Sequence, residues 1–261
     1  MTQPIDFEAS SVEPEAENIR IPALPVRVCQ VFTAPGTLFD HLKRKPVWVS
    51  AMAGLVLLGI AQYVLTPDSL RSAAMEGYLP EGANFEIQIG SSGTATGNAQ
   101  ETPEPGSTLE VVGIIIGIGI GTPVIVAFVS FLLLIAFNVL LGGEAKFRQL
   151  YSAVTHGFYI TTIGEFVVLG LALLGSNETV LSPALLLPDL GDEFWGRLIG
   201  MINVFRVWVC FVLGIAISRI YPKRSPVGAT IYLLVLYLCQ TAIISAFIGL
   251  LAGGSGRELR L

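Results

Sequence analysis

Long apolar runs separated by short polar connections dominate the pattern along this chain. A helix needs roughly 20 apolar residues to cross the hydrocarbon core of a bilayer. The run over residues 47–65 carries no charged side chain, follows the basic cluster Lys43–Lys45, and ends before Pro67. Both flanks are typical of a membrane span, because charge stays at the headgroups and proline favours helix ends. The pattern therefore predicts a first span here.

The next apolar run, residues 110–141, is too long for one straight span and too short for two, which would need about 40 residues. One long, tilted helix bent near Gly121–Pro123 fits it, and a re-entrant hairpin is the alternative. Three further runs follow. The pattern predicts five spans, over residues 47–65, 111–141, 153–174, 198–217 and 227–252.

Polar segments divide the rest of the chain. Residues 1–27 are acidic and lack the basic-then-apolar order of a signal peptide, so we expect a disordered cytoplasmic tail and an uncleaved first span. Residues 66–109 include a stretch rich in Gly, Ser, Thr and Pro, which predicts a flexible outer loop. Residues 253–261 form a short C-terminal tail. The membrane domain is expected over 28–252.

Composition agrees with this division. The 261 residues are 52% apolar and only 13% charged, and their mean hydropathy is +0.69. Soluble domains carry about 25% charged residues, so much of this surface must face lipid. The chain has no basic surface of the kind that binds nucleic acid. We therefore expect an all-α integral membrane protein with a bundle of five transmembrane helices. Its main partner is expected to be the lipid bilayer.

The distribution of Lys and Arg predicts the orientation. Ten of the chain's 15 Lys and Arg residues lie before the first span, after the second or after the fourth, and all three segments share one side. Cytoplasmic loops carry the excess of basic residues. We therefore expect a cytoplasmic N-terminus and an outer C-terminus, although Arg257 and Arg260 then lie outside, against the rule.

Two full charges fall inside predicted spans. Glu165 and Arg206 each lie nine residues from the outer end of consecutive antiparallel spans, which predicts similar depth and a contact inside the bundle. Asn203, three residues before Arg206, would extend this polar cluster. A charge at this depth is costly unless it is paired. A buried pair that fixes helix register is the favoured interpretation, and a substrate or proton pathway is the other.

No motif indicates catalysis. The three cysteines form no CxxC pair and no ligand cluster with the two histidines, and no HExxH or phosphate-binding loop is present. We expect no enzyme activity, no cofactor and no metal. His156 lies near the cytoplasmic end of its span, where hydration alone could accommodate it, and a packing role is favoured over a functional one. Gly117 and Gly121 have GxxxG spacing, which permits close helix packing, including packing in a homo-oligomer.

Several segments resemble the Yip1 domain family when they are taken in order. They are Val31-Phe32 with Pro35, Phe39 and Leu42; Pro46 and Trp48; Gly142–Ser152; and Phe205, Trp208 and Leu213–Ala216. The resemblance covers roughly Val28 to Leu251 and implies five spans with a cytoplasmic N-terminus. Eukaryotic relatives bind Rab-type GTPases, but their DLYGP motif is absent here, so GTPase binding is not carried over.

The resemblance is to prokaryotic members and implies a bacterial cytoplasmic (inner) membrane location. The function expected is that of a non-enzymatic protein that organises membrane partners or lipids. The alternative is a small transporter or channel-like permease that uses the Glu165/Arg206 pair. A pathway predicts a water-accessible cavity that reaches Glu165, whereas an organising protein predicts a dry pair.

Overall fold

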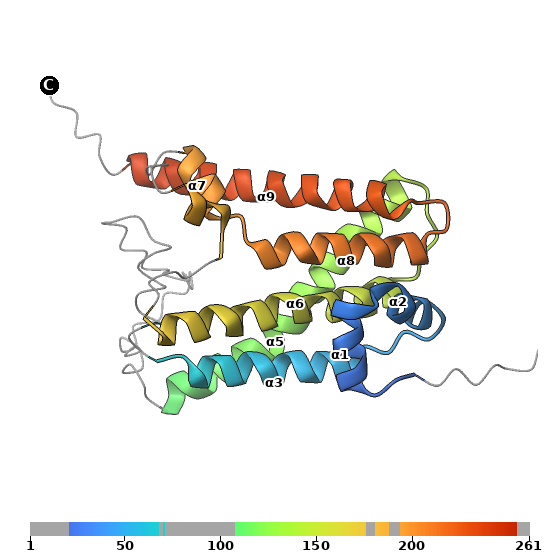
Figure 1. Cartoon of the computed structure of the whole chain (residues 1–261), viewed down its shortest axis with the longest axis horizontal. Helices are drawn as coiled ribbons and strands as arrows, with labels where there is room; N and C mark the ends of the chain where they lie inside the picture. Colours follow the sequence, from blue (N-terminus) through green and yellow to red (C-terminus); the bar gives the residue numbers. More distant parts are fainter. Residues whose placement is uncertain (1–20, 68–69, 71–107, 176–180, 188–193, 255–261) are drawn as a thin grey trace, which may run out of the picture.

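The computed structural model describes residues 21–67, 70, 108–175, 181–187 and 194–254, and every regular element in these ranges is helical. Five helices run back and forth between two ends of the bundle (Figure 1). They are α3 (Val49–Leu65), α5 (Thr108–Leu134), α6 (Phe147–Leu173), α8 (Val204–Ile220) and α9 (Pro226–Gly254). Four of them lie side by side in the order α3, α6, α8, α9, and α5 crosses the layer diagonally.

Three of the described helices are long and apolar enough to cross a membrane, or four if a bent pair counts as one span. The three are Val111–Leu140, Phe147–Leu173 and Pro226–Gly249. Large apolar side chains such as Phe128 and Ile243 are 61% and 69% exposed on the outside of the bundle. Such a surface is suited to lipid rather than water. The chain thus has the long apolar helices typical of an integral membrane protein.

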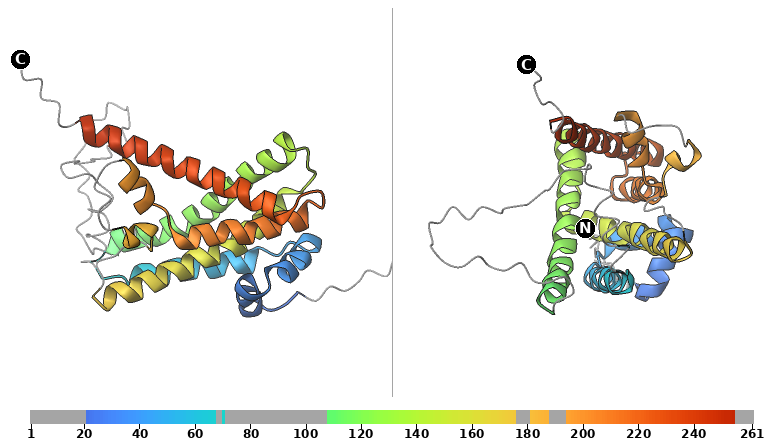
Figure 2. Two further views of the ribbon diagram at one scale, coloured as in Figure 1. Left: turned by 45° about the horizontal axis from the view of Figure 1, so that its top comes forward. Right: turned by 90° about the vertical axis from the view of Figure 1, so that its left-hand side faces the viewer.

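The second predicted span is one helix. It continues from Val111 to Leu140 over 30 residues, through Pro123, with its last six residues in the π-helical segment η1 (Ile135–Leu140). The expectation of one long helix is therefore confirmed, and the re-entrant alternative is wrong, because the helix continues through Pro123 without a break. The bend expected near Gly121–Pro123 stays a prediction. At 1.5 Å per residue this helix is about 45 Å long, which exceeds a hydrocarbon core of about 30 Å. The oblique course of α5 in both views of Figure 2 fits this excess length.

The fourth predicted span, 198–217, is broken instead. It consists of α7 (Phe194–Gly200) and α8, which meet at 63° across a short break. Asn203 lies directly before α8 in extended geometry, with φ −97° and ψ 125°. Asn at this position favours a helix start, because its side chain can accept the first free N–H groups. The third span also differs from its prediction, since α6 begins at Phe147.

Two short helices, α1 (Leu24–Thr33) and α2 (Pro35–Arg44), pack on the bundle at the end where α3 and α6 begin (Figure 1). Each buries one face, with Arg27 and Val31 in α1 and Leu38, Phe39 and Leu42 in α2. The predicted boundary of a disordered tail at residue 27 is therefore wrong, because α1 already begins at Leu24. Predictions for residues 1–20, 71–107 and 255–261 lie outside the described residues.

The connection between η1 and α6 is fixed by Asn138. Its Oδ1 accepts hydrogen bonds from the Tyr221 hydroxyl at 2.6 Å and from the Ala145 N–H at 3.1 Å, and its Nδ2 donates to the Ala145 carbonyl at 2.9 Å. Gly142 has φ +69°, a conformation that glycine adopts without strain. A side chain on Gly143 would meet the Tyr221 ring. The two glycines thus let this turn lie directly on the corner between α8 and α9.

Candidate functional site

The structure brings Glu165 and Arg206 together at the side of the bundle. Glu165 lies on α6, where it is acted on by the charge of Arg206 on α8 and accepts a hydrogen bond from the Gln62 side chain on α3. Both charged side chains are exposed, so their predicted place inside the bundle is wrong. The reason is the helix contact next to them, because Gly164 packs against the Phe205 ring. This packing turns the following residue on each helix outward.

Asn203 has a different role from the one predicted. Its Oδ1 accepts the backbone N–H of Phe205 at 2.8 Å and that of Arg206 at 3.3 Å, so its side chain caps α8. A cap of this kind contributes about 1 kcal/mol to helix stability. The prediction placed Asn203 on a continuous helix and therefore on the face of Arg206. The break before α8 removes it from that face.

A second polar cluster, which sequence reasoning missed, is buried under α1. Arg27 is only 4% exposed, and its guanidinium donates to His156 Nε2 at 3.1 Å, to the Val47 carbonyl at 3.3 Å and to Ser50 Oγ at 2.7 Å. These partners belong to α6 and to the beginning of α3. His156 is fully buried, which rules out hydration as the explanation for a histidine at this position. One arginine thus joins α1 to two helices of the layer.

The hydrogen bonds around His156 determine its tautomer. A guanidinium can only donate, so Nε2 accepts from Arg27. A carbonyl can only accept, so Nδ1, 2.7 Å from the Ser152 carbonyl, carries the ring proton. Burial lowers the pKa of Arg27, against a smaller opposite effect of Tyr159, yet arginine stays protonated in proteins. A neutral imidazole therefore binds a buried cation.

Most of the described basic residues lie in α2, at the beginning of α6, at the end of α8 or in the adjoining connections. These segments meet at the same end of the bundle as α1 and α2 (Figure 1). Asp40 of α2 pairs with Arg219 of α8 at 3.6 Å, and the Gln149 side chain of α6 donates to the Lys43 carbonyl at 2.8 Å. These contacts hold the helix termini together. The basic end is defined by eight Lys and Arg side chains that are at least partly exposed: Lys43, Arg44, Lys45, Lys146, Arg148, Arg219, Lys223 and Arg224.

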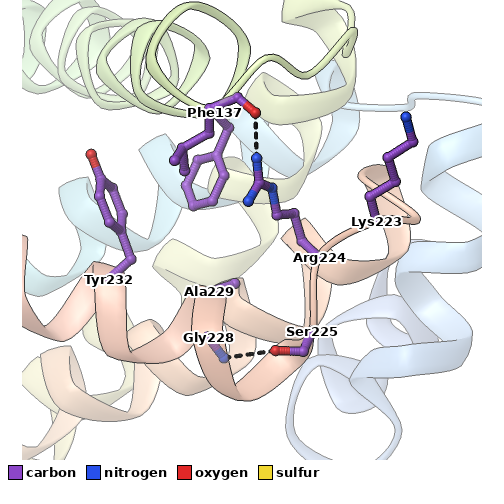
Figure 3. A pocket seen from close by; sticks show the side chains of 8 residues that line it. Phe137, Lys223, Arg224, Ser225, Gly228, Ala229 and Tyr232 are labelled. Carbon is purple, nitrogen blue, oxygen red and sulfur yellow. Dashed lines mark hydrogen bonds between the residues drawn. The ribbon is translucent and has the colours of Figure 1, made fainter.

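A cavity of about 410 Å³ opens at this basic end, between the end of η1 and the beginning of α9 (Figure 3). Arg224 donates a hydrogen bond to the Leu141 carbonyl, which holds its guanidinium beside the Phe137 ring. The Tyr232 ring lies edge-on to Phe137, with their centroids 5.3 Å apart. Lys223 extends at the rim beyond Arg224 (Figure 3). The cavity thus has aromatic walls and a basic rim.

Among the described residues, no group of three or more His, Cys, Asp and Glu is placed to hold a metal ion. The predicted GxxxG pair does not pack against any other described residue. A Cβ on Gly117 or Gly121 would have no heavy atom of the described chain within 4 Å. Gly164, in contrast, lies directly on Phe205. Close helix approach among the described residues occurs at α6 with α8, and also at α8 with α9, where a Cβ on Gly214 would lie 2.9 Å from the Thr230 backbone nitrogen.

The fold and these clusters define the class, an all-helical protein with several long apolar helices, a buried Arg27–His156 contact and a basic end. No family model matches the chain, and no curated protein or solved structure matches it. The resemblance to the Yip1 domain family therefore remains a prediction from the sequence.

Proposed function

We propose that this chain is a non-catalytic integral membrane protein that organises lipids or other membrane proteins through its basic end. The observation that carries the proposal is the construction of that end. Eight partly exposed Lys and Arg side chains converge there from α2, α6, α8 and the connections between helices. Of the described acids, Asp40 and Glu144 lie at this end, and Asp40 is paired with Arg219. A positive surface beside apolar helices suits anionic headgroups or acidic segments of membrane proteins.

The proposal includes five crossings with the basic end in the cytoplasm. The helices α3, α5, α6, α8 and α9 alternate in direction between the two ends, as the ribbon in Figure 1 allows the reader to follow. Helices α3 and α8 have 17 residues each, about 25 Å, which a bilayer can accommodate by local thinning. The positive-inside rule then places the N-terminus in the cytoplasm and the C-terminus outside.

The Yip1-like segments belong to this proposal as well. They support a non-enzymatic role and, because they resemble prokaryotic members, a place in a bacterial cytoplasmic membrane. The open glycine face of α5 adds support for association with a second copy or another membrane protein, since no residue in the described part of the chain covers Gly117 or Gly121.

Extraction of the protein into native nanodiscs tests this function. The measured quantities are the ratio of anionic to zwitterionic lipid around the protein and the proteins present in fixed proportion to it. We expect Arg44→Glu with Lys45→Glu to lose the anionic lipid severalfold. The control is Pro67→Glu with Leu174→Glu, which adds two carboxylates at the opposite end and should leave the ratio unchanged. Equal behaviour of both variants would contradict the proposal.

A second function, transport, is favoured by the break between α7 and α8. Transporters often bind substrate where a helix is interrupted, and here Arg206 lies in the first turn of α8, beside Glu165. Reconstituted protein should then conduct protons or an anion in a way that Glu165→Gln abolishes. Gln62→Leu, which removes the hydrogen bond but keeps the charge, should weaken conduction less. Liposomes that stay tight with the native protein under a proton or chloride gradient would exclude this candidate.

A further inference from the structure

The cavity at the basic end is suited to one kind of ligand. Its lining residues are Phe137, Leu141, Lys223, Arg224, Ser225, Gly228, Ala229 and Tyr232. None of these eight, all in the described part of the chain, is acidic, and two are cationic. Its volume of about 410 Å³ is that of an ordinary small-ligand site. The chemistry at the rim selects an anion.

The guanidinium of Arg224 is prepared for such an anion. The hydrogen bond to the Leu141 carbonyl fixes its position and uses one of its five N–H donors. A planar guanidinium held in this way can direct a second edge to a phosphate. Lys223, one residue earlier, is exposed and also lines the cavity. It therefore adds a second positive charge at the rim.

The walls distinguish a lipid from a free phosphate. Phe137 is 1% exposed, and its ring, with Tyr232 and Ala229, forms an apolar wall beside the two cations (Figure 3). Further along the face of α9 that carries Gly228 and Tyr232, Leu236 and Ile243 are 41% and 69% accessible. An inorganic phosphate has no apolar part that could be buried against this surface. A phospholipid would place its headgroup at the rim and its acyl chain along α9.

We propose that this cavity binds an anionic phospholipid, with the lipid phosphate held by Arg224 and Lys223 and the acyl chain lying along α9. The proposal deepens the function proposed above and rests on it for the presence of this end at the membrane surface. Anionic lipids are concentrated in the cytoplasmic leaflet, and basic pockets between helices on that side are suited to their headgroups.

Nanodiscs made from phosphatidylcholine and phosphatidylglycerol test the proposal, with bound lipids counted by native mass spectrometry. Because both leaflets have the same composition, the result does not depend on orientation. We expect the native protein to retain phosphatidylglycerol selectively and Lys223→Glu to reduce this retention about fivefold or more. Arg224→Gln should do the same. The matched control, Lys146→Glu, makes the same charge change at the basic end but outside the cavity. It should weaken the general attraction of anionic lipid to this end but leave the lipid bound in the cavity in place.

Arg224→Gln also removes the contact with Leu141, so thermal unfolding is measured for every variant. Lys223 is exposed, and a folded Lys223→Glu protein that keeps its phosphatidylglycerol would overturn the proposal. Equal losses in Lys223→Glu and Lys146→Glu would also overturn it, because they would indicate general surface attraction. Release of the lipid by soluble glycerol phosphate at low millimolar concentration would show a phosphate site without lipid specificity. If the cavity variants keep their phosphatidylglycerol but the Arg44/Lys45 variant loses anionic lipid, the proposed function stands and the proposed cavity site is wrong.

Discussion

At the scale of single residues, glycine at position 143 allows two loops to meet. A Cβ there would lie 2.7 Å from the Phe137 carbonyl oxygen and would overlap the Tyr221 ring. Neither neighbour can move easily, because Phe137 is buried and the Tyr221 hydroxyl is held by Asn138. Gly143 is therefore a position where the backbone of one connection approaches the side chain of another.

Gly143→Ala is expected to destabilise the protein by about 1–3 kcal/mol, the usual cost of overpacking a dense site. Thermal unfolding in detergent measures this loss. Gly113→Ala on α5 is the matched control, since a Cβ there would meet no atom of the described residues within 4 Å. That substitution should be neutral or slightly stabilising, because alanine favours helix. Equal effects of the two substitutions would show that the Tyr221 contact is not formed.

The buried Arg27–His156 contact leads to a second prediction at this scale. His156→Ala should cost on the order of 2–3 kcal/mol, because it leaves a buried charged donor without its acceptor. In Arg27→Met with His156→Ala the total loss should be smaller than the sum, with a coupling of about 1–2 kcal/mol. Thermal unfolding of the four proteins gives this coupling. Additive losses would mean that the two side chains do not interact.

Tyr221 gives a prediction about pH. Burial raises the pKa of its hydroxyl to about 12, above the ordinary value of about 10. The folded protein therefore keeps a proton that the unfolded chain loses, and this contribution to stability, fully present below pH 10, is lost as the pH rises toward 12. Unfolding measured from pH 8 to pH 11 should show a steeper decline for the native protein than for Tyr221→Phe. Parallel declines would contradict it.

At the scale of elements, α9 holds the two halves of the broken helix together. The Tyr237 hydroxyl accepts the Asn203 N–H at 2.9 Å and donates to the Met201 carbonyl at 3.3 Å, which supplies partners to both sides of the break. Ser245 donates to the Phe194 carbonyl at 3.3 Å, at the beginning of α7. Backbone groups freed by a break need such partners where water is scarce.

Tyr237→Phe should therefore cost about 1–3 kcal/mol, because two backbone groups lose their partner without any change in apolar packing. Hydrogen exchange at residues 201–204 should increase with it. Tyr232→Phe is the control, because Tyr232 lies in the same helix as Tyr237 and its ring packs on Phe137. This substitution should change stability by less than about 0.5 kcal/mol. An unchanged Tyr237→Phe protein would mean that other groups stabilise the break.

The sequence predicted the elements better than their contacts. Apolar runs and their basic or proline flanks located α3 within two residues and α9 closely, because hydropathy reports lipid exposure directly. The break before α8 was missed because apolar Met201 and Ile202 continue the run between α7 and α8. The available signals were Gly200, which ends α7, and Asn203, which caps α8. The α1 helix was missed because a buried arginine looks polar in sequence, and its partner His156 is 129 positions away.

At the scale of the whole molecule, two ends of different character define the protein. At the basic end, several contacts join the helix termini. They include the ion pair of Asp40 with Arg219 and the hydrogen bonds of Asn138. At the other end α9 diverges from α8, with α7 between them (Figure 2). We expect the basic end to be the site of lipid and partner binding, because there the charges are held by fixed helix termini.

The central claim is that five segments cross the membrane with this basic end inside. Labelling of single cysteines with a membrane-impermeant maleimide tests it most directly, in a background without Cys29, Cys210 and Cys239. Cysteines at Pro67 and Leu174 should be labelled in intact cells, whereas cysteines at Arg148 and Pro222 should be labelled only after the membrane is opened. Cysteines at positions 148 and 174 lie near opposite ends of α6 and should be labelled from opposite sides of the membrane. Labelling of both from the same side would contradict the five-span arrangement.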